Sequence, residues 1–211
     1  VGGRKLEIFT SRGLTNVQFR LKTLIICYKA IEDAKYFGKF INNHIETLTH
    51  VELKYSAPIS ILNCFNRVKM IQKLIFAWGK PDTADYDVRE NVKELEISTT
   101  STFDLAVKFP KLRKLDIFVK SEAQNFKLGM FEEMTNLGIS GYRIQELSIS
   151  SSIKFISFVD YTFASMPRFE QFKFEEIELA NCQNVDWLAD FLAKDDTRIK
   201  KLKIKNMTLS G

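Results

Sequence analysis

A short motif with apolar residues at its positions 1, 4 and 6 recurs along the chain, and this recurrence limits the possible fold more than any other feature. One complete unit runs from Phe169 to Ile204, where two copies of the motif flank a polar turn and an amphipathic segment. The first copy carries Phe169, Phe172 and Phe174, and the second carries Ile199, Leu202 and Ile204. A period of this kind indicates an array of stacked structural units.

Nine copies of the motif can be placed. Their residues at positions 4 and 6 are Leu6/Ile8, Leu24/Ile26, Val51/Leu53, Leu74/Phe76, Leu95/Ile97, Leu115/Ile117, Leu147/Ile149, Phe172/Phe174 and Leu202/Ile204. Successive copies lie about 24.5 residues apart on average, within the period of roughly 20 to 29 residues found in leucine-rich repeats. Position 1 is also apolar in every copy except the first, which has Gly3, although only 45% of the chain is hydrophobic.

Alternate residues of a strand face opposite sides, so positions 4 and 6 are expected to point inward and positions 3, 5 and 7 outward. Stacked copies would form one parallel sheet over a continuous core. The pattern therefore predicts an α/β leucine-rich repeat solenoid, with a curved parallel sheet on the concave side and helices or irregular turns on the convex side. We expect helices within 31–41 and 185–192, and a longer loop or irregular segment within 126–141.

We interpret residues 1–211 as a single leucine-rich repeat domain of about nine irregular repeats. The composition suits a packed domain, because 45% of the residues are hydrophobic and 12% are aromatic. No apolar run approaches the roughly 20 residues that span a bilayer, so no membrane segment is expected. The chain begins at Val1 without a methionine, and we expect it to be a fragment of a longer protein.

Two stretches carry a family resemblance, Phe40–Leu53 and Trp187–Lys194. Their alternation of strand motif and helix resembles the leucine-rich repeat regions of F-box proteins and is similar to ribonuclease-inhibitor-like repeats. The resemblance implies a substrate receptor of a cullin-RING ubiquitin ligase, whose F-box would bind a Skp-type adaptor while the repeats hold the substrate. No F-box lies in these residues, and the Asn or Cys usual after each repeat strand is mostly absent. These positions hold Ser11, Lys29, Ser56, Gly79, Thr100, Lys120, Ser152, Ile177 and Met207.

Catalytic and metal-binding motifs are missing from the sequence. The two histidines, His44 and His50, form no H-E-x-x-H pair, and Cys27, Cys64 and Cys182 form no C-x-x-C pair. There is no P-loop, no G-x-G-x-x-G and no G-x-S-x-G. We therefore expect no enzyme activity, no catalytic residue, no metal and no cofactor. The odd, widely spaced cysteines favour a reducing location, cytoplasmic or nuclear.

The outward residues of the predicted concave face are the candidate partner-binding residues. They are Glu7, Ile25, Glu52, Ile75, Glu94, Glu96, Asp116, Phe118, Lys173, Lys201, Lys203 and Lys205. The central position 5 changes from acidic to basic along the array, with Ser148 between Asp116 and Lys173, and such a strip could orient a protein partner. Exposed Phe9, Ile25, Ile75 and Phe118 would be its apolar anchors.

Other interpretations of the same residues remain open. Mixed outward charges are typical of repeat proteins in general, and Ile25 and Ile75 could pack under a cap or a neighbouring loop. The cluster Lys200–Lys205 could protect an edge strand. It is not interleaved with stacking aromatics, so nucleic acid is not favoured as a partner despite the net charge of +5. Alternatives to the ligase role are a scaffold or inhibitor and an extracellular recognition domain, which would be glycosylated at Asn206.

Overall fold

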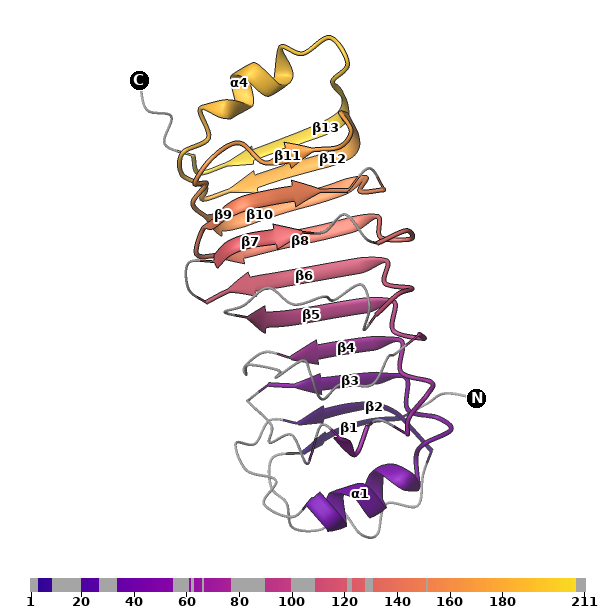
Figure 1. Ribbon diagram of the computed structural model, residues 1–211. Helices are drawn as coiled ribbons and strands as arrows, with labels where there is room; N and C mark the ends of the chain where they lie inside the picture. The colour runs from indigo at the N-terminus through magenta and orange to yellow at the C-terminus, as the bar shows by residue number, and fades with distance from the viewer. Residues whose placement is uncertain are drawn as a thin grey trace. The chain divides into compact units, whose positions relative to one another are not determined.

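The computed structural model describes residues 4–8, 20–26, 34–54, 61, 63–65, 67–76, 90–99, 109–120, 123–127, 131–150 and 152–207. The chain divides into two compact units. Unit 1 comprises residues 1–98 and 107–110, and unit 2 comprises residues 99–106 and 111–211. Figure 1 shows the elements of each unit, and the two are considered separately below.

Unit 1 contains parallel strands that follow one another in the sheet in the order of the sequence. The strands are β1 (Arg4–Ile8), β2 (Leu21–Ile26), β3 (His50–Leu53), β4 (Lys73–Phe76) and β5 (Glu94–Thr99). Helix α1 (Ala34–Asn42) lies within the segment that connects β2 to β3. It falls where the apolar spacing of 31–41 predicts a helix.

The predicted register of unit 1 is confirmed by the strand pairing. Leu24 pairs with Val51, Val51 with Leu74, and Leu74 with Leu95, so the position 4 residues form one continuous row. All four of these side chains are buried, as are Ile26, Leu53 and Ile97 at position 6. In this register, each residue of the motif lies beside the equivalent residue of the next strand. The same apolar positions therefore form the core in successive turns.

Unit 2 is a solenoid with two sheets, and the chain alternates between them. The longer sheet has the order β6 (Lys114–Val119), β8 (Asn136–Gly141), β10 (Phe155–Tyr161), β12 (Lys173–Ala180) and β13 (Arg198–Lys205). The shorter sheet has the order β11 (Arg168–Phe169), β9 (Ile144–Ile149) and β7 (Ala123–Lys127). All observed pairings within both sheets are parallel. The turns that contain β7, β9 and β11 therefore take one strand from each sheet (Figure 1).

The register predicted for unit 2 is wrong at two copies of the motif. Leu147 and Ile149 are buried, but they belong to β9 in the shorter sheet. Phe174 occupies position 1 rather than position 6, because Ile177 and Leu179 of β12 pair with Ile156 and Phe158 of β10. The position 4 and 6 pairs of the longer sheet are Leu115/Ile117, Leu137/Ile139, Ile156/Phe158, Ile177/Leu179 and Leu202/Ile204. The first four pairs are buried, whereas Leu202 and Ile204 of the last strand, β13, are 36% and 50% exposed. The irregular segment predicted within 126–141 contains β8 instead.

A left-handed residue ends four of the five strands of the longer sheet. It stands at motif position 8 and is Gly141, Asp160, Asn181 or Asn206, with φ between 51° and 92°. Glycine, asparagine and aspartate tolerate this region best. The next residue is buried after Asp160 and Asn181, where it is Tyr161 and Cys182, but it is the exposed Tyr142 after Gly141. The Cys182 Sγ donates to the Phe158 carbonyl at 3.3 Å.

The C-terminal half of unit 2 has an aromatic core. Helix α4 (Trp187–Leu192) replaces the short strand in the last turn and confirms the helix predicted within 185–192. Its Phe191 lies 4.7 Å from Phe169, 5.8 Å from Trp187 and 6.2 Å from Phe174, measured between ring centroids. Such contacts stabilise a core beyond the burial of area alone.

Both units have the parallel strands and inward apolar rows of a β-solenoid. In unit 2 the shorter sheet, and not a series of helices, forms the second wall in the turns that contain β7, β9 and β11. The single domain over residues 1–211 stays a prediction. Among the described residues, neither helix has the length and apolar character that crossing a bilayer requires.

Candidate partner-binding surface

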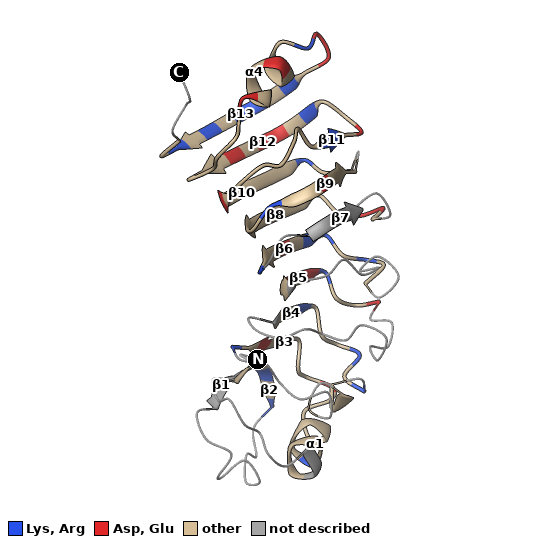
Figure 2. Cartoon of the chain, turned by 60° about the vertical axis from the view of Figure 1, so that its left-hand side comes forward, with Lys and Arg blue, Asp and Glu red and all other residues tan. Residues whose placement is uncertain are grey.

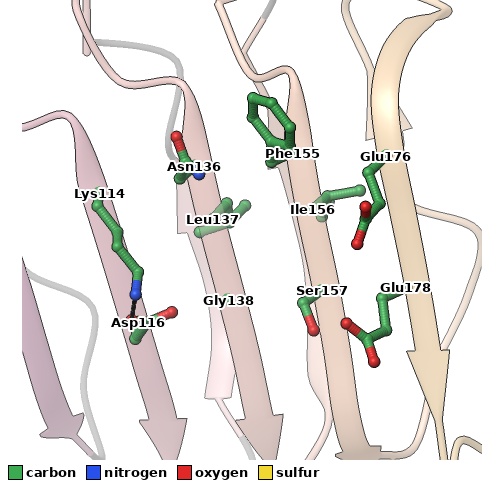
Figure 3. A pocket seen from close by; sticks show the side chains of 10 residues that line it. All are labelled: Lys114, Asp116, Asn136, Leu137, Gly138, Phe155, Ile156, Ser157, Glu176 and Glu178. Atoms are coloured by element: carbon green, nitrogen blue, oxygen red, sulfur yellow. Dashed lines mark ion pairs between the residues drawn. The ribbon is translucent and has the colours of Figure 1, made fainter. Parts of the chain in front are cut away.

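A groove of about 190 Å³ lies on the outward face of the longer sheet of unit 2 (Figure 3). It crosses β6, β8, β10 and β12, and the strands hold its side chains at defined positions because their register is continuous. The lining residues are Lys114, Asp116, Asn136, Leu137, Gly138, Phe155, Ile156, Ser157, Glu176 and Glu178. We refer to this site as the outer groove.

Small residues form the floor of the outer groove. Gly138 and Ser157 both stand at motif position 5, between Asp116 on β6 and Glu178 on β12. The Asp116 carboxylate extends over Gly138, since a Cβ atom added there would lie 2.3 Å from Asp116 Oδ1. A larger residue at 138 would therefore displace that carboxylate. The groove exists because glycine and serine interrupt a row of longer side chains.

Aromatic rings border this region of the sheet. Phe155 lines the groove at position 3 of β10 and is 41% exposed. Phe118 stands at position 7 of β6 and is 45% exposed, as the sequence predicts. β8 and β10 carry no charged side chain among their outward residues at positions 3, 5 and 7, which are Asn136, Gly138 and Ser140, and Phe155, Ser157 and Val159. An uncharged strip with the exposed Phe155 ring thus separates the charged strands β6 and β12.

Charged side chains flank this strip on both sides. On β6, Lys114 Nζ lies 3.0 Å from Asp116 Oδ2. On the other side, Glu176 and Glu178 of β12 lie next to lysines of β13. Figure 2 shows the acidic colour on β12 beside the basic colour on β13. The pairs that join these two strands are Glu176–Lys201 at 3.2 Å, Glu176–Lys203, Glu178–Lys203 at 3.9 Å and Glu178–Lys205 at 2.7 Å.

The cross-strand pairs change the acidity of their members. Hydrogen bonds from Lys203 and Lys201 lower the pKa of Glu176, and the hydrogen bond from Lys205 lowers the pKa of Glu178. The hydrogen bond to Glu176 raises the pKa of Lys203. Each shift favours the charged form, so these carboxylates stay ionised well below neutral pH.

In unit 1, the strand pairing aligns the residues that the sequence predicts for the outward row, with one correction. Glu7, Ile25, Glu52, Ile75 and Glu96 are paired in succession across β1 to β5. Ile25 is buried rather than exposed, and Ile75 is half-buried, so the prediction that Ile25 is an exposed anchor is wrong. Residues on both faces of β2 are buried at this point, which agrees with the alternative that Ile25 packs beneath other residues. Phe9 lies outside the described residues.

Two of the remaining acidic candidates in unit 1 form ion pairs. Glu94 Oε2 lies 3.0 Å from Lys73 Nζ on the adjacent strand, and Glu52 Oε1 lies 4.0 Å from Lys54 Nζ. These side chains are partly exposed, and pairs of this kind contribute little to stability.

In unit 2, the predicted change from acid to base along position 5 is corrected. Lys173 pairs with Arg198 near the start of β12 and β13, and Ser148 lies in the shorter sheet. The observed row is Asp116, Gly138, Ser157, Glu178 and Lys203. Lys201, Lys203 and Lys205 do stand on the outward face of β13, but opposite the carboxylates of β12.

Sequence reasoning missed most residues of the outer groove. Gly138, Phe155, Ser157, Glu176 and Glu178 were not among the candidates, because the copies of the motif on β8, β10 and β12 were not placed. The signal was available in the recurring spacing of position 1, at Met134, Ile153 and Phe174, which are buried in the structure.

Within the described residues, no group of three or more His, Cys, Asp or Glu side chains could hold a metal ion. Burial raises the pKa of the thiols of Cys64 and Cys182. Thiols of this kind are poor nucleophiles at neutral pH. Cys27 lies outside the described residues.

Comparison with known proteins finds no relative: no protein-family model, no curated protein and no solved structure matches the chain. The architecture defines the class, a parallel-sheet solenoid. Its function therefore has to be inferred from the surface that the solenoid presents.

Proposed function

We propose that the chain is a non-enzymatic protein-interaction module that holds a partner protein on the outward face of its parallel sheet. The observation that carries this proposal is the outer groove of unit 2, an uncharged strip with an exposed phenyl ring between two strands of charged side chains. Interfaces combine apolar anchors with a polar rim in this way.

The size of the outer groove favours a protein over a small metabolite. Pockets that enclose drug-sized ligands measure about 300–1,000 Å³, whereas the outer groove measures about 190 Å³. It lies on a broad sheet surface that carries a second exposed ring at Phe118. A partner could place one side chain in the groove and rest its neighbouring residues on the surrounding strands.

The finer proposal is that this solenoid is a leucine-rich repeat array that recognises the substrate of an F-box ubiquitin ligase. The position 1, 4 and 6 pattern holds in all five strands of the longer sheet once the register is corrected. Cys182 occupies the position where such repeats usually have Asn or Cys. The curved arrangement and the Skp-type adaptor are drawn from the family resemblance.

Site-specific cross-linking tests the interaction role. A photo-reactive amino acid at position 155 should capture a partner that is then identified and purified. Ser157→Arg should weaken binding of that partner at least tenfold, because the new side chain fills the floor of the groove. Ser165→Arg, the same change on an exposed loop of unit 2, should leave binding unchanged. Equal affinities of the two variants would refute the proposed surface.

The ligase role has a separate test. Full-length protein should retain a purified Skp-type adaptor in a pull-down experiment. If the adaptor is not retained while the groove variants still lose their partner, the ligase role fails and the interaction role stands.

A further inference from the structure

We propose that the outer groove receives an arginine side chain of the partner protein. This inference rests on the proposed function and adds the chemistry of the ligand. It follows from the position of the carboxylates around the groove, from the exposed ring of Phe155 and from the space above Gly138.

The charges that line the groove favour a cation. Three carboxylates, Asp116, Glu176 and Glu178, are opposed there by the single ammonium group of Lys114. The lysines that neutralise Glu176 and Glu178 belong to β13, which pairs with the edge of β12 that faces away from β10. A cation over β8 and β10 would thus approach these carboxylates from the side opposite their lysines.

Asp116 and Glu178 face each other along the position 5 row. Three strand spacings separate them, roughly 14 Å between Cα atoms at about 4.8 Å a strand. Both side chains extend into this interval, above Gly138 and Ser157 (Figure 3). Since Lys114 binds Oδ2 of Asp116, Oδ1 is the oxygen directed over Gly138. The gap between the two carboxylates is where the ligand would sit.

Guanidinium suits this gap better than ammonium. It is planar and carries donors on several edges, so one group can bind acceptors on different sides. It also stacks on aromatic faces, and the Phe155 ring is exposed at the groove. The Ser157 hydroxyl adds an acceptor on the floor. Lysine offers a compact charge without the planar face.

Gly138 determines whether the gap is open. Alanine at this position would place its Cβ 2.3 Å from Asp116 Oδ1 and 3.3 Å from Asp116 Cγ. The flexible carboxylate would move and the backbone would stay in place, since the nearest backbone atom is 3.7 Å away. Gly138→Ala therefore alters the binding site while leaving the fold intact.

The test is an amide-resonance NMR titration of the full chain with N-acetyl-arginine-methylamide. Saturable shifts should be centred on Gly138 and Ser157. The lysine analogue, which has the same charge, should bind at least fivefold more weakly, and the uncharged citrulline analogue should give no saturable shifts. Asp116→Asn, Glu178→Gln and Gly138→Ala should each weaken arginine binding at least threefold. Glu133→Gln removes an exposed carboxylate that pairs with Arg113 outside the groove and should have no effect.

Several outcomes would overturn the inference. These are the absence of saturable shifts with the arginine probe, equal binding of arginine and citrulline, and binding unaffected by the groove variants. A response of the β13 amides to N-acetyl-glutamate-methylamide without any response to arginine would point to an acidic partner instead. If the arginine probe does not bind while Ser157→Arg still weakens binding of the purified partner, the proposed function stands without this ligand. If arginine binds but Ser157→Arg leaves the partner bound, the proposed function fails.

Discussion

The hydroxyl group of Tyr161 allows the cost of one substitution to be worked out from the structure. The main-chain N–H of Ile144 donates to Tyr161 Oη at 2.9 Å, and both residues are buried. Tyr161→Phe removes the acceptor and keeps the ring, so the buried N–H loses this partner. Leaving a buried donor unsatisfied costs about 1–3 kcal/mol. At about 2–4 °C per kcal/mol for a chain of this size, Tm should fall by about 2–12 °C.

Urea unfolding followed by circular dichroism measures this loss, with the slope m unchanged. Tyr142→Phe is the matched control, because Tyr142 is 62% exposed in the same unit, and it should change the free energy of unfolding by less than about 0.5 kcal/mol. A Tyr161→Phe variant as stable as the control would refute the reasoning.

Tyr161 should also make the stability of the fold depend on pH in the alkaline range. Burial raises the pKa of Tyr161 to about 12, above the value near 10 of an exposed tyrosine. The unfolded chain therefore releases this proton more readily, and stability should fall as the pH rises above about 10. Tyr161→Phe should lose this part of the pH dependence.

Three further predictions concern stability. Burial lowers the pKa of His44, so the unfolded chain takes up the proton first and stability should fall as pH drops below about 6.5; His44→Phe should reduce the difference between urea midpoints at pH 7.5 and pH 5. Gly141→Ala should cost about 1–3 kcal/mol in urea unfolding, because φ is 92° and the new Cβ would lie 2.3 Å from the Val119 carbonyl oxygen; an unchanged midpoint would contradict this. Phe191→Ala should cost about 3–5 kcal/mol, whereas Leu192→Ala at an exposed position of the same helix should cost under about 1 kcal/mol by the same assay.

The parallel array and its inward rows could be predicted from the sequence because stacking repeats one burial pattern. In unit 1 the strand pairing from β1 to β5 and the burial of Leu24, Val51, Leu74 and Leu95 follow that prediction. The pattern failed in unit 2 where two walls face the same core, since Ile144, Leu147 and Ile149 of β9 reproduce the apolar spacing of the longer sheet. Periodicity reports which side chains are buried, but it does not report which wall they come from.

The candidate site was harder to predict for a related reason. Its floor depends on Gly138 and Ser157, which have no apolar or charged signature, and they become informative only when their strands are known to be adjacent. Phe118 and Asp116 were found because β6 was placed correctly. Lys173 was misplaced because two sets of residues fit the motif. Phe169, Phe172 and Phe174 have the same spacing as Phe174, Ile177 and Leu179, which occupy positions 1, 4 and 6 of β12.

The left-handed residues that end successive strands of unit 2 have an evolutionary consequence. Gly141, Asp160, Asn181 and Asn206 mark the same point of four consecutive coils, so a segment excised between two of them contains one whole coil. Duplicating or deleting such a segment would leave every remaining strand opposite an equivalent neighbour. The molecule could thus gain or lose length in whole coils by recombination, and its outer face would be extended or shortened without being redesigned.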